Sequence, residues 1–134
     1  MRKEFVLASI VALLLAGLVL AQSDSDYQGW MKMNAANAGS LGKNIQAKNG
    51  EGAAADAMKL EATLKQVEAY WQQKNVPDAV AFAQKGQAAA GEVAKAASAG
   101  DMDTAAAQMK SMQGNCGGCH MAHREGSPGA FKMK

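Results

Sequence analysis

Apolar side chains recur every three or four residues along most of residues 24–124, which is the spacing of one face of an α-helix. Gly, Asn and Pro residues interrupt this pattern at a few points. No segment is predicted to form a β-strand. The pattern therefore predicts an all-α chain.

The interruptions divide the pattern into four predicted helices, at about residues 24–47, 53–73, 78–98 and 101–123. A turn is predicted over residues 48–52, and Gly100 is predicted to end the third helix. Asp101 or Asp103 is predicted to cap the fourth. Four amphipathic helices of similar length with short connections predict an antiparallel four-helix bundle.

The two ends of the chain differ from this pattern. A short basic start is followed by the apolar stretch from Val6 to Leu20, which predicts a signal peptide over residues 1–21 and a single mature domain over residues 22–134. An uncleaved anchor is disfavoured because a membrane span usually needs about 20 apolar residues. At the other end, regular structure is predicted to stop near Glu125, with Lys132 to Lys134 frayed.

Charge gives little information about partners. The chain has 14 Lys and Arg residues against 12 Asp and Glu residues, mixed along its length. This near balance predicts neither a nucleic-acid partner nor binding to an anionic membrane after the signal is cleaved.

The only two cysteines lie in the run Cys116-Gly117-Gly118-Cys119-His120. C-x-x-C-H is the attachment signature of a c-type haem. On a helix, positions i, i+3 and i+4 share one face, so both thiols can bond one porphyrin while His120 binds its iron. The run therefore predicts one covalent haem c per chain, and the cysteines also fall on the apolar stripe of the fourth helix.

Three other uses of this run remain open: a disulfide, a thioredoxin-like redox pair, and zinc held with His120 and His123. A redox C-x-x-C normally follows a strand in a βαβ unit, which the pattern does not predict. Four zinc ligands on one helical stretch form a poor tetrahedron. Haem attachment is the favoured interpretation.

Two motifs resemble the class II cytochromes c, which comprise cytochrome c-prime and its low-spin relatives. One motif is Cys116 to Arg124, and the other is Tyr27 to Lys32, at the start of the first helix. The resemblance implies an exported four-helix bundle with one haem near the C-terminus, hence a periplasmic protein. It also implies a non-enzymatic electron carrier that meets redox partner proteins and commonly dimerises through its first two helices.

In the low-spin relatives a methionine followed by lysine supplies the second iron ligand, and Met31-Lys32 matches that pair. The resemblance also places Arg124 near the haem, where it can contact a propionate. His123 departs from the aromatic residue that the family usually has there. Without a methionine ligand, the resemblance implies an open iron that binds small gases such as nitric oxide or carbon monoxide, beside Asn34.

Helical spacing separates the two candidate methionines of the first helix. Met31 falls on the apolar stripe, whereas Met33 falls beside polar positions. A peroxidase is disfavoured because the stripes carry no further histidine that could act as an acid-base catalyst. The apolar faces are rich in alanine, so haem is predicted to supply much of the buried surface and the apoprotein is predicted to be unstable.

Overall fold

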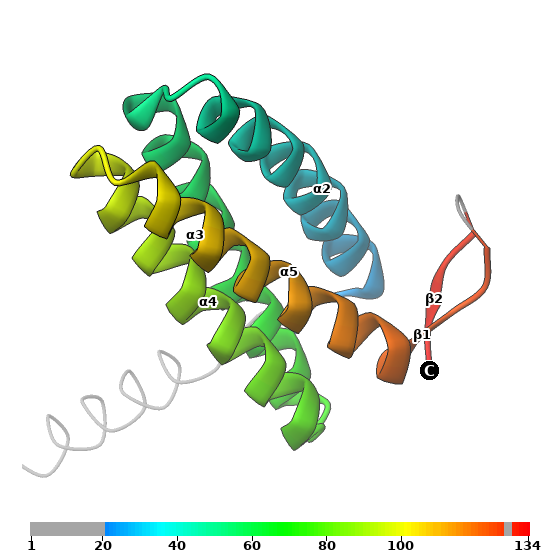
Figure 1. Cartoon of the computed structure of the whole chain (residues 1–134). Helices are drawn as coiled ribbons and strands as arrows, with labels where there is room; N and C mark the ends of the chain where they lie inside the picture. Colours follow the sequence, from blue (N-terminus) through cyan, green and yellow to red (C-terminus); the bar gives the residue numbers. More distant parts are fainter. Residues whose placement is uncertain (1–20, 128–129) are drawn as a thin grey trace, which may run out of the picture.

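The computed structural model describes residues 21–127 and 130–134, so the predicted signal segment lies outside the described residues except for Ala21. Four helices form an antiparallel bundle: α2 (Asp24–Gln46), α3 (Gly50–Gln73), α4 (Pro77–Ser98) and α5 (Met102–His123). Consecutive helices pack side by side, whereas α2 and α5 meet at only a few places (Figure 1). The predicted all-α four-helix bundle is confirmed. Within the described part of the chain, no helix is both long and apolar enough to cross a membrane.

Side-chain caps set several helix boundaries. Ser23 caps α2 by accepting from the backbone N–H of Asp26, whose carboxylate accepts from the Ser23 N–H in return. At α5 the cap is Asp101 rather than Asp103, because the Asp101 carboxylate accepts from the Thr104 N–H at 3.0 Å. Gly100 follows α4 with a φ of 78°, which confirms its predicted role as the residue that ends the helix.

The α2–α3 connection is shorter than predicted. The Asn49 side chain accepts from the Gly52 N–H and starts α3 at Gly50, so the last three residues of the predicted turn are helical. A Cβ added at Gly50 would lie 2.6 Å from the carbonyl oxygen of Ala97. Glycine therefore lets the start of α3 approach the end of α4. Turn propensity depends on neighbouring residues in the sequence, so it could not predict this long-range contact.

The chain after α5 forms a short hairpin, where irregular structure was predicted. Strands β1 (Arg124–Glu125) and β2 (Lys132–Met133) pair antiparallel, with Arg124 opposite Met133. The backbone N–H of Lys134 donates to the carbonyl oxygen of His123 at 3.0 Å. The prediction that Lys132 to Lys134 fray was therefore wrong.

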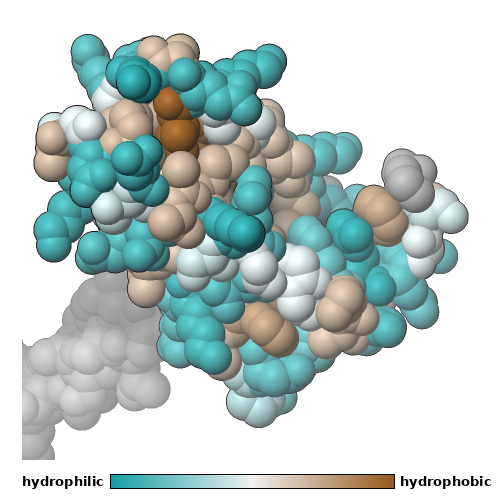
Figure 2. Space-filling view, viewed as in Figure 1, coloured by the Kyte–Doolittle hydropathy of each residue, from teal (hydrophilic) through white to brown (hydrophobic). Residues whose placement is uncertain are grey.

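Two clusters of buried side chains hold the bundle together. The alanine cluster surrounds the α2–α3 and α4–α5 connections and contains Leu41, Ala53, Ala54, Ala57, Leu60, Ala89, Ala90, Val93, Ala96, Ala97, Ala105 and Met112. The aromatic cluster lies toward the α3–α4 connection and contains Tyr27, Val67, Tyr70, Trp71, Ala79, Ala83 and Cys119. On the face drawn in Figure 2, hydrophilic side chains border a band of apolar ones.

Candidate functional site

A cavity of about 650 Å³ lies inside the bundle, bordered by all four helices and by the hairpin. We call it the bundle cavity. All five site residues predicted from the sequence line it: Met31, Cys116, Cys119, His120 and Arg124. The start of α2 and the end of α5, far apart in the sequence, lie close together (Figure 1), and both border this cavity.

The two cysteines lie one helical turn apart on α5, at the junction of the two clusters. Cys116 packs against the alanine cluster and Cys119 belongs to the aromatic cluster; both are free thiols. Burial raises the pKa of both thiols, and for Cys119, with the added effect of the neighbouring Cys116 and Asp78 charges, to about 11. A catalytic redox thiol needs a lowered pKa, so this environment disfavours the thioredoxin-like alternative.

His120 is half-buried at the wall of the bundle cavity. Burial, and secondarily the positive charge of Arg124, lower the pKa of its imidazole below the ordinary value of 6.5. Neutral imidazole is therefore favoured at neutral pH. That is the form that donates a nitrogen lone pair to a metal ion.

The two glycines between the cysteines have different surroundings. Gly117 lines the bundle cavity, and a Cβ added there would meet no atom within 4 Å. At Gly118 an added Cβ would lie 2.6 Å from Cε1 of Phe82 on α4. Gly117 thus leaves cavity space open, whereas Gly118 permits α5 to approach the Phe82 ring.

Met31 and Met33 are separated as their helical spacing predicts. Met31 is half-buried, packs against the aromatic cluster and lines the bundle cavity. Met33 is 51% exposed. Of these two thioethers on α2, only that of Met31 borders the same space as His120.

His123 also lines the bundle cavity, but its ring contacts Asp78 and Trp71. Its Nε2 lies 2.7 Å from Oδ2 of Asp78, and its ring lies 5.2 Å from the ring of Trp71. This hydrogen bond is also the main reason that the pKa of Asp78 lies below its ordinary value. Among the residues that the structure describes, no cluster of three or more His, Cys, Asp or Glu side chains is placed to hold a metal ion. The zinc alternative therefore has no preformed site here.

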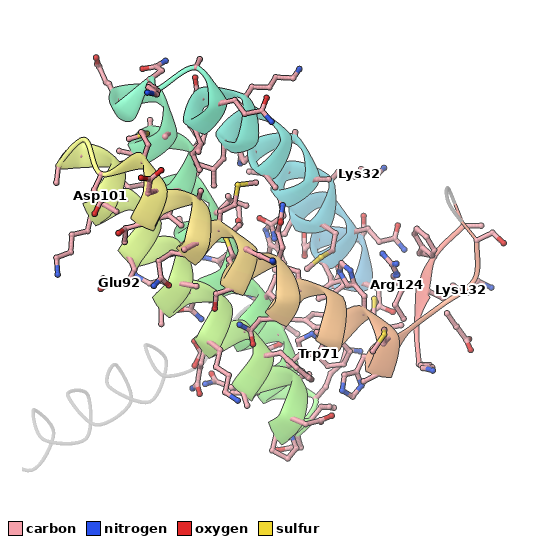
Figure 3. All side chains as sticks on the ribbon, in the orientation of Figure 1. Lys32, Trp71, Glu92, Asp101, Arg124 and Lys132 are labelled. Atoms are coloured by element: carbon pink, nitrogen blue, oxygen red, sulfur yellow. The ribbon has the colours of Figure 1, made fainter. Side chains whose placement is uncertain are left out.

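Sequence reasoning missed the contribution of the hairpin. Phe131, Lys132 and Met133 line the bundle cavity, and the guanidinium carbon of Arg124 lies 3.9 Å from the centre of the Phe131 ring. Figure 3 shows Arg124 and Lys132 at the hairpin, beside the start of α2. The alternation of apolar and basic residues from Phe131 to Lys134 is a strand pattern, but it is too short to stand out in a helical chain.

The bundle cavity suits a haem group. Its volume lies within the range of roughly 300–1,000 Å³ that small-molecule and cofactor sites occupy, and apolar side chains predominate in its wall. Its wall offers two thiols, two imidazoles (His120 and His123) and three thioethers (Met31, Met112 and Met133). Thiols, imidazole and thioether are the groups that tether and ligate c-type haem. The space at Gly117 adds room beside the thiols.

Comparison with known proteins gives one family match. Residues 68–124, from the last two turns of α3 through α4 and α5 to Arg124, match the family described as Cytochrome C′. No curated protein and no solved structure matches the chain. Proteins of this family are non-enzymatic, typically periplasmic, and bind one c-type haem. Over residues 68–124, which include the C-x-x-C-H run, this chain is similar to the cytochrome C′ family.

Proposed function

We propose that the chain is a monohaem electron carrier in which Cys116 and Cys119 hold the haem, His120 is the proximal iron ligand and Met31 is the second axial ligand. Haem c supplies a one-electron ferrous–ferric couple. The observation that carries the proposal is that Met31 and His120, from opposite ends of the sequence, line one cavity with both thiols.

Tethering by the two thiols needs no further reactant. Cys116 and Cys119 would hold the haem through two thioether bonds, each formed by adding one S–H across one vinyl C=C, with sulfur on one carbon and hydrogen on the other. The raised pKa values of Cys116 and Cys119 keep them as protonated thiols. Because the two cysteines are one turn apart on a rigid helix, both bonds fix the cofactor against α5.

Met31 and His120 are held by different helices, and this arrangement suits electron transfer. Two fixed ligands leave the site little to rearrange when its charge changes. A thioether also raises the reduction potential relative to a nitrogen ligand. Packing of Met31 against the aromatic cluster restricts its side chain and limits the entry of water.

A gas-binding function is the second candidate, and the placement of Asn34 favours it. Asn34 lines the bundle cavity one helical turn after Met31, and its Oδ1 accepts a hydrogen bond from the hydroxyl of Thr63. That bond orients the amide and leaves its NH₂ group available as a donor. If Met31 does not bind the iron, Asn34 can hydrogen-bond a small ligand on that side.

Absorption spectra of the purified protein distinguish these functions. The electron carrier is expected to be low-spin, with a thioether-to-ferric-iron band and no carbon monoxide binding. Met31→Ala should retain the haem and become high-spin, while Met33→Ala, an exposed position on the same helix, should leave the spectrum unchanged. Met133 of the hairpin also lines the cavity, and Met133→Ala tests whether its thioether binds the iron instead. A high-spin wild-type protein that binds carbon monoxide supports the gas-binding function instead.

The proposal also covers export of the protein and its partners. We propose cleavage after Ala21, a periplasmic location and exchange of electrons with other redox proteins, without nucleic-acid or membrane binding. A homodimer through α2 and α3 is the proposed assembly. N-terminal sequencing of the periplasmic protein and sedimentation analysis test the cleavage site and the assembly.

A further inference from the structure

Two contacts attach the paired strands of the hairpin to the helices. Its strands pair with each other, and the Lys134 N–H donates to the last carbonyl of α5. Met133 packs against the aromatic cluster. Gly126 has a φ of 97°, and a Cβ there would lie 2.6 Å from the carbonyl oxygen of Ala130. The close return of the chain therefore depends on glycine at position 126.

The anchored hairpin forms one wall of the bundle cavity. Phe131, Lys132 and Met133 are consecutive, and all three border the cavity. Phe131 and Met133 are half-buried, whereas Arg124, opposite Met133 on the other strand, is exposed. The hairpin thus places an aromatic ring and a cation at the rim of the same space.

The charges at this rim have one sign. Among the residues that the structure describes, Lys32, Arg124 and Lys132 line the cavity and no Asp or Glu does. None of these three cations forms an ion pair within the described residues. Haem carries two carboxylates on one edge of an apolar ring. An apolar cavity with a cationic rim matches that distribution of charge.

The Phe131 ring fixes the position of one of these cations. The Arg124 guanidinium lies over the ring face at 3.9 Å, within the distance at which a cation is attracted by an aromatic ring. Arginine that stacks through its flat face keeps its N–H donors free at the edges. Arg124 would otherwise be a flexible side chain directly after the helix.

We propose that the hairpin is a functional wall of the haem site, and that Phe131 is a positioning residue that holds Arg124 at the cavity rim as a counter-charge for the carboxylate edge of the haem. This inference rests on the proposed attachment of haem at Cys116 and Cys119. A fixed positive charge near the iron favours the ferrous form, which is less positive by one unit. Arg124 held in place therefore raises the reduction potential.

The test is a double-mutant cycle on the holoprotein, with the midpoint reduction potential as its readout. Arg124→Gln is expected to lower the potential, and Phe131→Ala is expected to lower it in the same direction by a smaller amount. Because Phe131 acts through Arg124, the double variant should match Arg124→Gln alone. Phe131→Tyr, which keeps an aromatic face, should restore the wild-type potential.

Lys134→Gln is the matched control, since it removes a charge from the hairpin at a position that does not line the cavity. Intact mass is measured for every variant. If haem is attached but Phe131→Ala leaves the potential unchanged, or if the two effects add, the positioning role is overturned and the proposed function stands. If no variant and no wild-type protein carries haem, both are overturned.

Discussion

The alanine cluster and the aromatic cluster close the same bundle by different means. Eight of the twelve residues of the alanine cluster are alanines, and there the backbones of α3 and α4 approach closely at Gly50 and Ala97. The aromatic cluster contains Tyr27, Tyr70 and Trp71, whose ring centres lie 4.6–5.6 Å apart. Small side chains let helices meet in the alanine cluster. The aromatic cluster places Tyr27 at the cavity that we assign to the haem, with Tyr70 and Trp71 packed behind it.

This difference assigns stability and function to different regions. At the alanine end, helix–helix contact closes most of the core, and only Leu60 and Met112 of this cluster line the bundle cavity. At the aromatic end, α2 and α5 border the bundle cavity, so the contents of the cavity contribute to holding them together. We therefore expect the aromatic end to depend on haem and the alanine end to depend on packing.

The largest effect is expected for the double variant Cys116→Ala, Cys119→Ala. Without the tether, haem should be lost, and the protein should lose on the order of 4 kcal/mol of stability together with its cooperative thermal transition. Circular dichroism measures the transition. Hydrogen exchange should show greater loss of protection near Tyr70 than near Ala97.

Ser111→Ala, at an exposed position on α5, is the control for this double variant. A double variant that unfolds at the same temperature and as cooperatively as the holoprotein would contradict the dependence of the aromatic end on haem.

The second effect tests packing at the alanine end. Leu41 is 0% exposed within the alanine cluster, so Leu41→Ala should cost about 2–5 kcal/mol of unfolding free energy. Haem attachment and the absorption spectrum should not change, because Leu41 does not line the bundle cavity. Denaturant unfolding measures the loss; a spectral change would show that the two ends are not independent.

Two glycine substitutions compare the ends directly. Gly50→Ala pushes a methyl group against the backbone carbonyl of Ala97, which cannot move away. The variant should lose about 1–3 kcal/mol of unfolding free energy. Gly118→Ala meets the edge of the Phe82 ring, which can turn, and should cost less than about 1 kcal/mol. Only Gly118→Ala should alter the absorption spectrum, since Phe82 lines the cavity. Equal losses of stability would contradict this contrast.

The smallest expected effect is on how folding stability changes at acidic pH. The His123 hydrogen bond holds the pKa of Asp78 below its ordinary value of 3.8. The bond therefore stabilises the fold at pH values above 3.8. This contribution is lost as the pH falls through the lower pKa of the folded state. Asp78→Asn should therefore lose less stability than wild type between about pH 6 and about pH 3. Denaturant unfolding at both pH values measures this, with Asp103→Asn, at an exposed carboxylate of α5, as the control. Identical acid profiles for wild type and Asp78→Asn would show that the bond contributes nothing.

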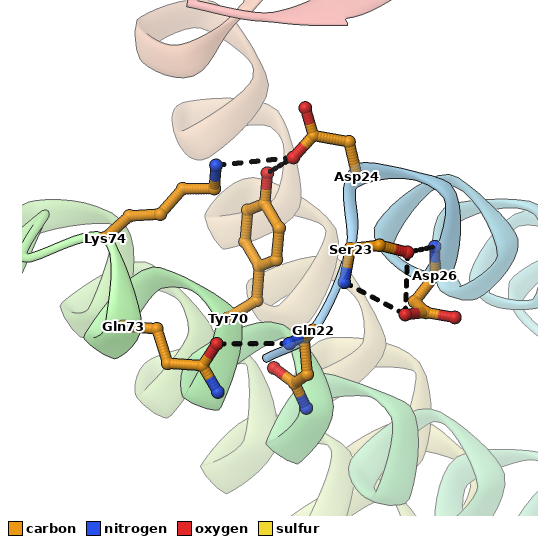
Figure 4. A network of polar contacts seen from close by, with 7 residues as sticks. All are labelled: Gln22, Ser23, Asp24, Asp26, Tyr70, Gln73 and Lys74. Atoms are coloured by element: carbon orange, nitrogen blue, oxygen red, sulfur yellow. Dashed lines mark hydrogen bonds and ion pairs between the residues drawn. The ribbon is translucent and has the colours of Figure 1, made fainter. Parts of the chain in front are cut away.

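A polar network also attaches the start of α2 to the end of α3 at the aromatic end. The Tyr70 hydroxyl donates to Oδ1 of Asp24 at 2.6 Å, and Nζ of Lys74 lies 3.3 Å from the same oxygen (Figure 4). Burial, and then the hydrogen bond to Asp24 and its negative charge, raise the pKa of the Tyr70 hydroxyl. The hydroxyl therefore remains a donor throughout the physiological range.

Helical periodicity was sufficient to predict the bundle because each of the four helices carries an apolar stripe and turn-forming residues separate them. The same periodicity placed Met31 and Cys119 on the inner side of their helices, and the structure brings both to the bundle cavity. Local pattern could not predict that α3 starts at Gly50, because that boundary depends on contact with Ala97 in another helix. Nor could it predict the hairpin.

The role of Gly118 is a further case in which sequence reasoning was incomplete. The motif treats its two central glycines alike, but Gly117 borders open space whereas Gly118 faces Phe82. A spacing motif states which residues share a helix face. It does not state which neighbouring helix lies against the remaining positions.

The central claim is that haem is bonded to Cys116 and Cys119, and intact mass spectrometry of the protein purified from the periplasm tests it most directly. The account predicts the mass of the mature chain plus one haem, and the mass of the mature chain alone for the double variant Cys116→Ala, Cys119→Ala. A wild-type protein with only the polypeptide mass would contradict it.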